Sequence, residues 1–109
     1  WQRYEDALKN SAQLKKKPED LEYNCAYAPV VFQSEEQATH VAASLKEQGV
    51  LARRYFYPSL DSVACLGKPA HQKVSSDIAK RILCLPIFSE LSESDQDVVI
   101  SVIEGELRA

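Results

Sequence analysis

The pattern of apolar and polar positions predicts a helix most clearly between residues 34 and 49. Ser34 is followed three residues later by Gln37, and at this spacing the two side chains cap the first turn of a helix. Gly49 is placed to end the helix in the left-handed conformation. One buried face is expected from four apolar residues at positions i, i+3, i+4 and i+7: Ala38, Val41, Ala42 and Leu45.

Looser forms of the same spacing predict three further helices. One spans residues 1–17 and ends in lysines, which favour the C-terminal end of a helix dipole. A short helix begins at Ser75 or Ser76, and the last helix begins at Ser92 with Asp95 three residues on. Their buried faces are expected to hold, in chain order, Tyr4, Ala7, Leu8 and Leu14; Ile78, Ala79, Ile82 and Leu83; and Val98, Val99, Val102, Ile103 and Leu107.

Three apolar stretches predict strands, near residues 25–33, 51–57 and 83–86. Pro29 marks an edge or a bulge in the first of them, because proline cannot donate to a ladder. Residues 58–74 show little periodicity and predict a surface loop, and loops of about fifteen residues are usually functional or covered by another chain. The expected fold is α+β, with a small three-stranded, mainly antiparallel sheet and four helices on one face.

Two cations run directly into three aromatic rings from Arg53 to Tyr57. Neighbouring side chains of a strand point to opposite faces, so these rings cannot all enter one core. Two interpretations stay open. Phe56 is buried in a central strand and the tyrosine hydroxyls find hydrogen-bond partners, or the segment faces a ligand.

Composition narrows the classes of function. The chain has 109 residues, 45% of them hydrophobic, and a net charge of -3. That size suits one domain, and the negative charge argues against a surface that binds nucleic acid through its phosphates. No apolar run is long enough to span a membrane, and no signal-peptide pattern opens the chain. Because the chain begins at Trp1 and lacks methionine, we expect it to be a segment of a longer protein.

Reactive side chains form no recognisable catalytic or metal pattern. Cys25, Cys65 and Cys84 are widely spaced, and His40 and His71 do not complete a ligand set. We expect free, mostly buried thiols in a reducing cytoplasm.

The carboxylates at helix starts fit favourable dipole placement better than acid–base catalysis. Asp61 either reaches a ligand or forms a turn, and the turn is the plainer interpretation.

The second half of the chain holds an ordered set of motifs. They are Arg54-Tyr55-Phe56-Tyr57-Pro58-Ser59-Leu60, then Lys68-Pro69-Ala70, then Ile82-Leu83-Cys84-Leu85-Pro86-Ile87, then Leu91-Ser92-Glu93-Ser94-Asp95 before a valine-rich helix. This ordered set resembles the DegT/DnrJ/EryC1/StrS family of pyridoxal-phosphate-dependent sugar aminotransferases. The aromatic motif resembles the branch that acts on 4-keto- or 3-keto-6-deoxyhexoses on a nucleotide or lipid carrier. Many relatives have Pro-Leu-His where this chain has Pro58-Ser59-Leu60, so no role of that histidine carries over.

The resemblance covers about residues 24–107 and implies the C-terminal small domain of such an enzyme. Residues 1–109 would be one domain, with 1–18 as a linking helix and 24–107 as the α+β core. The implied reaction moves an amino group from an amino acid, taken to be glutamate, to the keto-sugar. The implied partners are a missing N-terminal large domain and, in the parent enzyme, a second subunit of a homodimer.

The resemblance also implies where the chemistry lies. Pyridoxal phosphate would be bound by the large domain, so no catalytic, cofactor-binding or metal residue is expected here and the isolated chain should be inactive. None of the lysines considered is assigned the aldimine role: Lys15, Lys16, Lys17, Lys46, Lys68, Lys73 and Lys80. Arg53, Arg54, Tyr55 and Tyr57 are the candidate sugar or phosphate contacts.

Two other classes of function remain open at this point. The chain could be a stand-alone ferredoxin-like binding or regulatory module. It could also be an interaction domain that uses the aromatic segment as an edge strand. The coding sequence upstream of Trp1 separates the first alternative from the aminotransferase, because only the aminotransferase needs a long α/β domain there.

Overall fold

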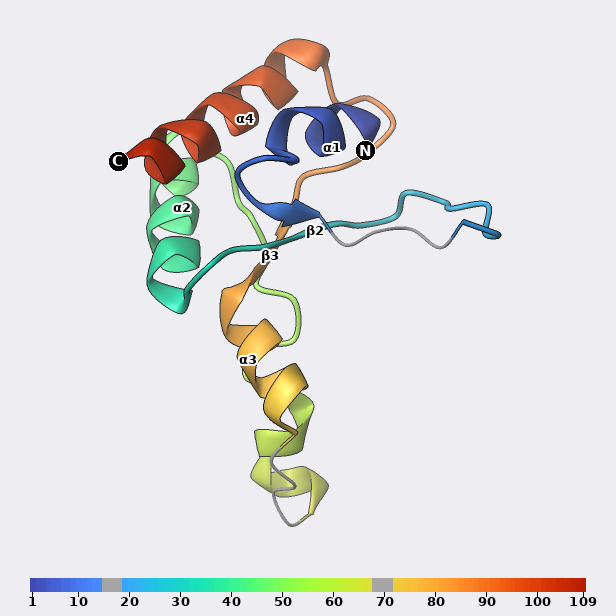
Figure 1. Cartoon of the computed structure of the whole chain (residues 1–109), viewed down its shortest axis with the longest axis vertical. Coiled ribbons are helices and arrows are strands. Elements are labelled where there is room, and N and C mark those ends of the chain that lie inside the picture. The colour runs from blue at the N-terminus through green and yellow to red at the C-terminus, as the bar shows by residue number, and fades with distance from the viewer. Residues whose placement is uncertain (15–18, 68–71) are drawn as a thin grey trace.

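The computed structural model describes residues 1–14, 19–67 and 72–109. These residues form a three-stranded antiparallel sheet in the order β1-β2-β3, with four α-helices and two short 3₁₀ helices (Figure 1). In chain order the elements are α1 (Gln2–Leu8), β1 (Gln13–Leu14), β2 (Ala28–Val31), α2 (Glu35–Glu47), η1 (Leu60–Ser62), η2 (Ala64–Leu66), α3 (Lys73–Arg81), β3 (Ile82–Leu85) and α4 (Glu93–Arg108). The expected α+β class with a small antiparallel sheet is confirmed.

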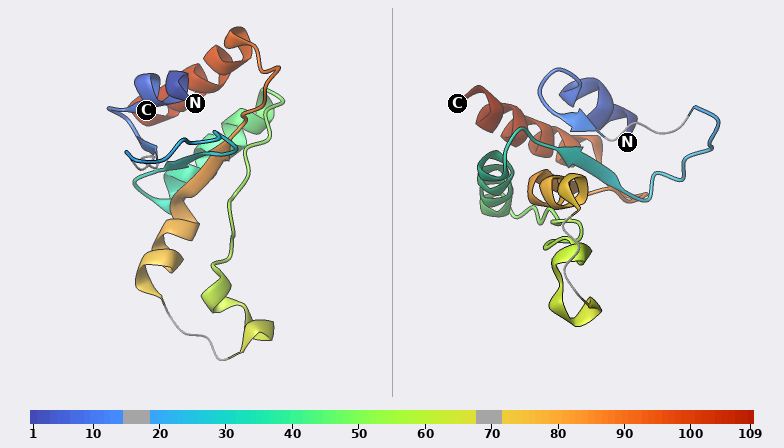
Figure 2. Two further views of the ribbon diagram at one scale, coloured as in Figure 1. Left: turned by 90° about the vertical axis from the view of Figure 1, so that its right-hand side faces the viewer. Right: turned by 60° about the horizontal axis from the view of Figure 1, so that its bottom comes forward.

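One face of the sheet carries the hydrophobic core. Val30 pairs with Leu83, and Ala28 with Leu85, so these four side chains share a face. Helices α1, α2 and α4 cover that face, whereas α3 leads directly into the start of β3 (Figure 2). The buried residues that the helices contribute are Tyr4, Leu8, Ala38, Val41, Leu45, Val99 and Ile103.

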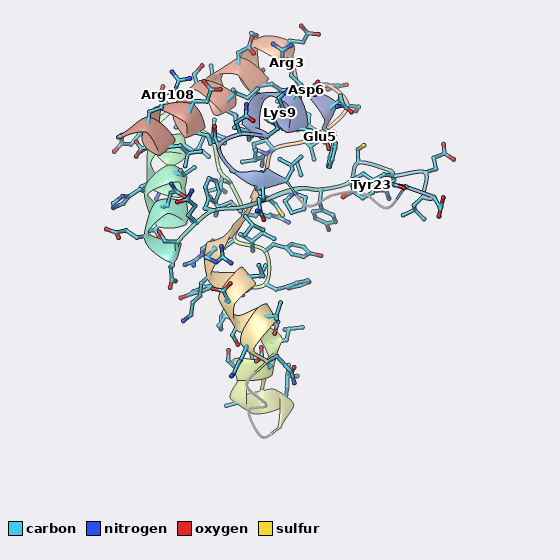
Figure 3. All side chains as sticks on the ribbon, viewed as in Figure 1. Arg3, Glu5, Asp6, Lys9, Tyr23 and Arg108 are labelled. Carbon is cyan, nitrogen blue, oxygen red and sulfur yellow. The ribbon has the colours of Figure 1, made fainter. Side chains whose placement is uncertain are left out.

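Helix α1 is held in place by a buried hydrogen bond on its inner side and by an ion pair on its outer side. Tyr4 is fully buried, and its hydroxyl donates to the carbonyl oxygen of Pro86 at 2.9 Å. Burial raises the pKa of Tyr4 to about 12, so the hydroxyl stays protonated and keeps donating. On the outside, Arg3 bridges to Asp97 of α4 with an N–O distance of 2.5 Å (Figure 3).

The two helices with capping signatures begin as predicted. Ser34 accepts a hydrogen bond from the N–H of Gln37 at the start of α2, and Ser92 accepts one from Asp95 at the start of α4. Gly49 has φ +75°, as expected for the residue that ends α2 in the left-handed conformation. On α4 the buried face is narrower than predicted, because Val98 is 43% exposed.

Pro29 lies in the central strand, not at an edge. Cys84, its partner in β3, directs both its N–H and its carbonyl away from β2, toward Arg53. The missing N–H of Pro29 therefore points toward β1, where pairing begins only at Val30. The proline removes no ladder bond, which explains why it is tolerated there.

The predicted strand at residues 51–57 is wrong. Only Arg53 pairs with the sheet, through a single antiparallel bridge to Cys84. Phe56 has φ +51° and is 58% exposed, so the interpretation that buries it in a central strand is also wrong. The third strand is instead β1, and an edge strand made of the aromatic residues does not form.

Other boundaries differ where local signals compete. The helix predicted for residues 1–17 ends at Leu8, and Gln13–Leu14 pairs with β2; Lys15 to Pro18 lie outside the described residues. Helix α3 begins at Lys73 with Gln72 as its N-cap, so neither Ser75 nor Ser76 is the cap. It ends at Arg81, and the apolar pair that was predicted to be helical, Ile82 and Leu83, opens β3.

Candidate functional site

The cationic-aromatic segment leaves the sheet directly after Arg53. The N–H of Arg53 donates to the carbonyl of Cys84 at 3.1 Å, and the N–H of Cys84 donates back at 2.8 Å. Beyond this bridge the chain turns at Phe56, in a conformation that a bulky side chain rarely adopts. The following Tyr57–Pro58 peptide bond is cis. The rings are thus presented by a turn.

Arg54 is held by two helices and a ring. Its Nη2 donates to Glu35 Oε1 at 3.0 Å and to the carbonyl oxygen of Lys80 at 2.9 Å. Its guanidinium carbon lies 3.5 Å from the centre of the Tyr57 ring, within cation–π range. The arginine therefore joins the start of α2, the end of α3 and the turn itself.

Glu35 completes this cluster. The hydrogen bond from Arg54 and a second one from the Tyr57 hydroxyl lower the pKa of Glu35, while partial desolvation acts in the opposite direction. The carboxylate therefore stays ionised well into the acidic range, and the ion pair persists with it.

A second group of rings lies beside the first. The rings of Tyr55 and Phe56 have their centres 4.3 Å apart, and Tyr55 lies 5.3 Å from Tyr27 of the segment that precedes β2. All three side chains are at least one-third exposed. They form an accessible aromatic surface, called here the aromatic patch (Tyr27, Tyr55 and Phe56).

Asp61 anchors the loop between the aromatic turn and α3. Its Oδ2 accepts from the N–H of Gln72 at 2.7 Å and from the Ser76 hydroxyl at 3.0 Å. Its Oδ1 accepts from Ser75 at 3.3 Å and from Ser59. The bonds from Ser59, from the N–H of Gln72 and from Ser76, in decreasing order, lower the pKa of Asp61 to about 2. Asp61 thus serves as a fixed anion at the N-terminus of α3, where the helix dipole favours it.

The four predicted contact residues do not line one common hollow. Tyr55 lines a hollow of about 1060 Å³ and also one of about 270 Å³. Tyr57 lines a separate hollow of about 250 Å³ beside Pro58 and Lys80. Arg53 lines another, of about 240 Å³, together with Tyr27 and residues that follow β3. The structure brings Arg54 and Tyr57 into contact and separates Arg53 from them.

Sequence reasoning missed the partners that hold this segment. Glu35 was attributed to helix-dipole placement alone, and Tyr27 was assigned only to a strand. The position of Glu35 in the first turn of a helix was a possible signal, because a carboxylate there can form an ion pair with an arginine from elsewhere in the chain. For Asp61 the turn interpretation was too narrow, because the carboxylate binds a helix start eleven residues away.

Other reactive groups are scattered. Cys25, Cys65 and Cys84 are free thiols as expected, but only Cys84 is buried. Among the residues that the structure describes, no cluster of three or more His, Cys, Asp or Glu side chains could hold a metal ion. The lysines within those residues are all exposed: Lys9, Lys46, Lys73 and Lys80.

The sequence profile of the DegT/DnrJ/EryC1/StrS aminotransferase family matches residues 1–104. The chain belongs to that family. This agrees with the resemblance carried by the motifs of its second half.

Individual relatives agree with this assignment. The dTDP-4-amino-4,6-dideoxy-D-glucose transaminase of Shigella dysenteriae is 32% identical over 85 residues, which cover 73% of this chain and 23% of that protein. A solved DegT DnrJ EryC1 StrS aminotransferase from Brucella abortus is 28% identical, with a TM-score of 0.81 over 95% of this chain and 28% of its own. The aminotransferase TlmJ from Streptoalloteichus hindustanus has a TM-score of 0.87 at 23% identity, over 98% of this chain and 29% of its own, and shows the shared fold.

These relatives are much longer, since the chain spans between 23% and 29% of their lengths. Across the described part of the chain, no helix is both long and apolar enough to span a membrane.

Proposed function

We propose that this chain is the C-terminal small domain of a longer pyridoxal-phosphate-dependent sugar aminotransferase. The observation that carries the proposal is the family match over residues 1–104, together with a relative that is 32% identical over 85 residues. The stand-alone ferredoxin-like module has no comparable support. The remaining part of the enzyme would form the large domain and one wall of the active-site cleft, with this domain as the other wall.

The proposed substrate is a 4-keto-6-deoxyhexose linked to a nucleotide, with glutamate as the amino donor. The named Shigella dysenteriae relative acts at a dTDP-linked 4-amino-4,6-dideoxyglucose, which favours the 4-position and a nucleotide carrier over a 3-keto sugar or a lipid carrier. The product would feed the synthesis of cell-surface polysaccharides or of other deoxyaminosugars.

The proposed contacts to this substrate remain Arg53, Arg54, Tyr55 and Tyr57. The backbone of Arg53 pairs with Cys84, but its side chain is exposed, so its guanidinium is accessible to a phosphate. Tyr55 lines the hollow of about 1060 Å³, where an aromatic ring can stack on a sugar or a base. Arg54 and Tyr57 hold each other, so either one positions the turn as well as contacting substrate.

Pyridoxal phosphate does not fit a site made from the described residues alone. An aldimine lysine lies in an enclosed pocket beside groups that bind the pyridine ring and the phosphate. Every described lysine is instead exposed at the surface. We therefore assign the cofactor to the proposed large domain and expect this chain alone to be inactive.

The proposed enzyme is a cytoplasmic homodimer. Its substrate, a sugar nucleotide, and its cofactor are both cytoplasmic metabolites, and the family is one of aminotransferases. The net charge of -3 supports an enzyme that binds no nucleic acid.

Product analysis tests the function. The longer polypeptide encoded around this chain is incubated with pyridoxal phosphate, glutamate and a panel of nucleotide-linked keto-sugars, including 3-keto, 4-keto and non-deoxy forms. We expect an amino sugar from the 4-keto-6-deoxy substrate and 2-oxoglutarate in equal amount. No amino sugar from any member of the panel would overturn the proposal, and amination of the 3-keto sugar alone would overturn the assigned position.

A further inference from the structure

The face of the sheet opposite the core borders a broad hollow. Val31 and Ile82 are register partners whose side chains point away from the core face. They line the hollow of about 1060 Å³, to which α3 and the aromatic turn also contribute. The apolar residues of this surface, called here the open face, are Leu14, Val31, Tyr55, Val74, Ile78 and Ile82.

The open face is exposed at Val74 and Tyr55, whereas Ile82 is buried at its floor, and it is continuous with the aromatic patch. Val74 is 77% exposed, although it lies in α3, and Tyr55 belongs both to the open face and to the aromatic patch. A contiguous apolar surface that is exposed across several elements often marks an interaction site.

The overall shape is also less compact than that of an ordinary domain of this length. Residues 19–27 project from one side of the body, and α3 with the two 3₁₀ helices projects from another (Figures 1 and 2). The radius of gyration is 14.7 Å, whereas a compact domain of this length has about 13 Å. Figure 3 shows Tyr23 on the first projection, where its ring centre lies 5.8 Å from that of Trp1.

We propose that the open face and the aromatic patch dock the large domain of the aminotransferase, so that the domain interface is apolar and runs over β1, β2 and α3. This inference rests on the proposed function. The occupant follows from length, because at least 71% of each compared relative lies outside the part that matches this chain. A second copy of the chain is the competing occupant.

Two exposed valines on helices make a matched pair for the test. Val74 lies in α3 on the open face, and Val98 lies in α4, which covers the opposite face of the sheet. Val74→Cys and Val98→Cys are introduced separately into the 109-residue chain and into the longer polypeptide. A bulky maleimide then labels each protein, and peptide mass spectrometry separates the new thiol from Cys25, Cys65 and Cys84.

We expect the cysteine at position 74 to react at least about tenfold more slowly in the longer polypeptide than in the 109-residue chain, because a docked domain covers it. The cysteine at position 98 should react at the same rate in both. Equal rates at position 74 would overturn the proposal. If position 74 is labelled slowly in the 109-residue chain itself, and more slowly as the protein concentration rises, a second copy covers the open face. That result would also overturn the proposal.

The labelling result and the function are separable. The unmodified longer polypeptide is assayed for amino-sugar formation in parallel. Slowed labelling in an inactive protein would keep the interface and remove the proposed function, whereas an active protein with unprotected position 74 would keep the function and remove the interface.

Discussion

Arg54 is the side chain on which most of the candidate site converges. One guanidinium reaches Glu35, the carbonyl of Lys80 and the ring of Tyr57. Arg54 can hold the turn in place and also contact a substrate, because both of its hydrogen bonds use the same nitrogen, Nη2. The other nitrogens of its fork are left for a phosphate or a sugar hydroxyl.

Replacement Arg54→Ala should therefore act on both stability and substrate affinity. We expect the free energy of unfolding to fall by at least the ~0.5–1 kcal/mol that an exposed cation–π contact contributes. In the longer enzyme the KM for the keto-sugar should rise, with a smaller change in kcat. Chemical denaturation and steady-state kinetics measure the two effects.

Arg108→Ala is the control for Arg54. Its side chain is 78% exposed and pairs with Glu104 on its own helix, so little loss of stability and no change in KM are expected. If Arg54→Ala lowers stability but leaves KM unchanged, Arg54 is a structural residue and leaves the proposed substrate site.

Asp61 gives a prediction in pH. Its pKa is lowered from 3.8 to about 2 in the folded chain, first by the Ser59 hydroxyl and next by the N–H of Gln72. A depressed pKa means that the stabilisation is complete well above pH 3.8 and is lost as the pH falls through about 2. Asp61→Asn should therefore unfold more easily than the unmodified chain at pH 7, and the difference should shrink toward pH 2. Urea denaturation at a series of pH values measures it, and a difference that stays constant with pH would contradict this assignment.

At the scale of elements, α2 and α4 owe their starts to two serines. Ser34 and Ser92 each accept an N–H that the helix leaves unpaired. Replacing either by Ala should lower the free energy of unfolding by about 0.5–2 kcal/mol, the usual effect of losing such a cap.

Ser101→Ala is the matched control for the caps, because Ser101 is exposed in the middle of α4. Alanine has the higher helix propensity, so this change should be neutral or slightly stabilising. Thermal or chemical unfolding monitored by circular dichroism compares the variants. A loss at Ser101 equal to that at Ser92 would mean that capping is not the cause.

The elements also mark where local patterns stop being informative. The starts of α2 and α4 were predicted correctly, because each signal lies within four residues of its helix. Residues 51–57 have strand-like composition but make only one bridge, because Arg54 turns toward Glu35 and Phe56 adopts a positive φ. Strand β1 is only two residues long and gave no signal of its own, since its pairing with Val30 and Val31 defines it.

At the scale of the molecule, the chain is expected to fold without binding pyridoxal phosphate. Its core joins three helices and two strands around residues such as Tyr4 and Leu45, so a folded state does not depend on a cofactor. Mixing with the cofactor followed by dialysis should leave no visible absorbance, whereas the longer polypeptide should retain it. Absorbance retained by the 109-residue chain would place a complete cofactor site within it.

The candidate site was partly predictable, because part of its signal lies in the local composition of the sequence. The sequence singled out the segment from Arg53 to Tyr57, because adjacent cations and rings are an unusual local composition. It did not group the four residues correctly, because grouping depends on a turn rather than on strand alternation. Arg53 and Tyr55 line different hollows, while Arg54 and Tyr57 touch.

The sequence by itself determined the fold class, the ends of α2, the start of α4 and the family, all of which rest on residues close together in the chain or on ordered motifs. The tertiary structure alone decided the third strand, the exposure of Phe56, the contacts of Arg54 and Asp61, and the open face. Capping and helical periodicity act over one or two turns, so they can be read locally. Strand pairing, long ion pairs and uncovered surface join residues tens of positions apart, and only the folded chain brings these together.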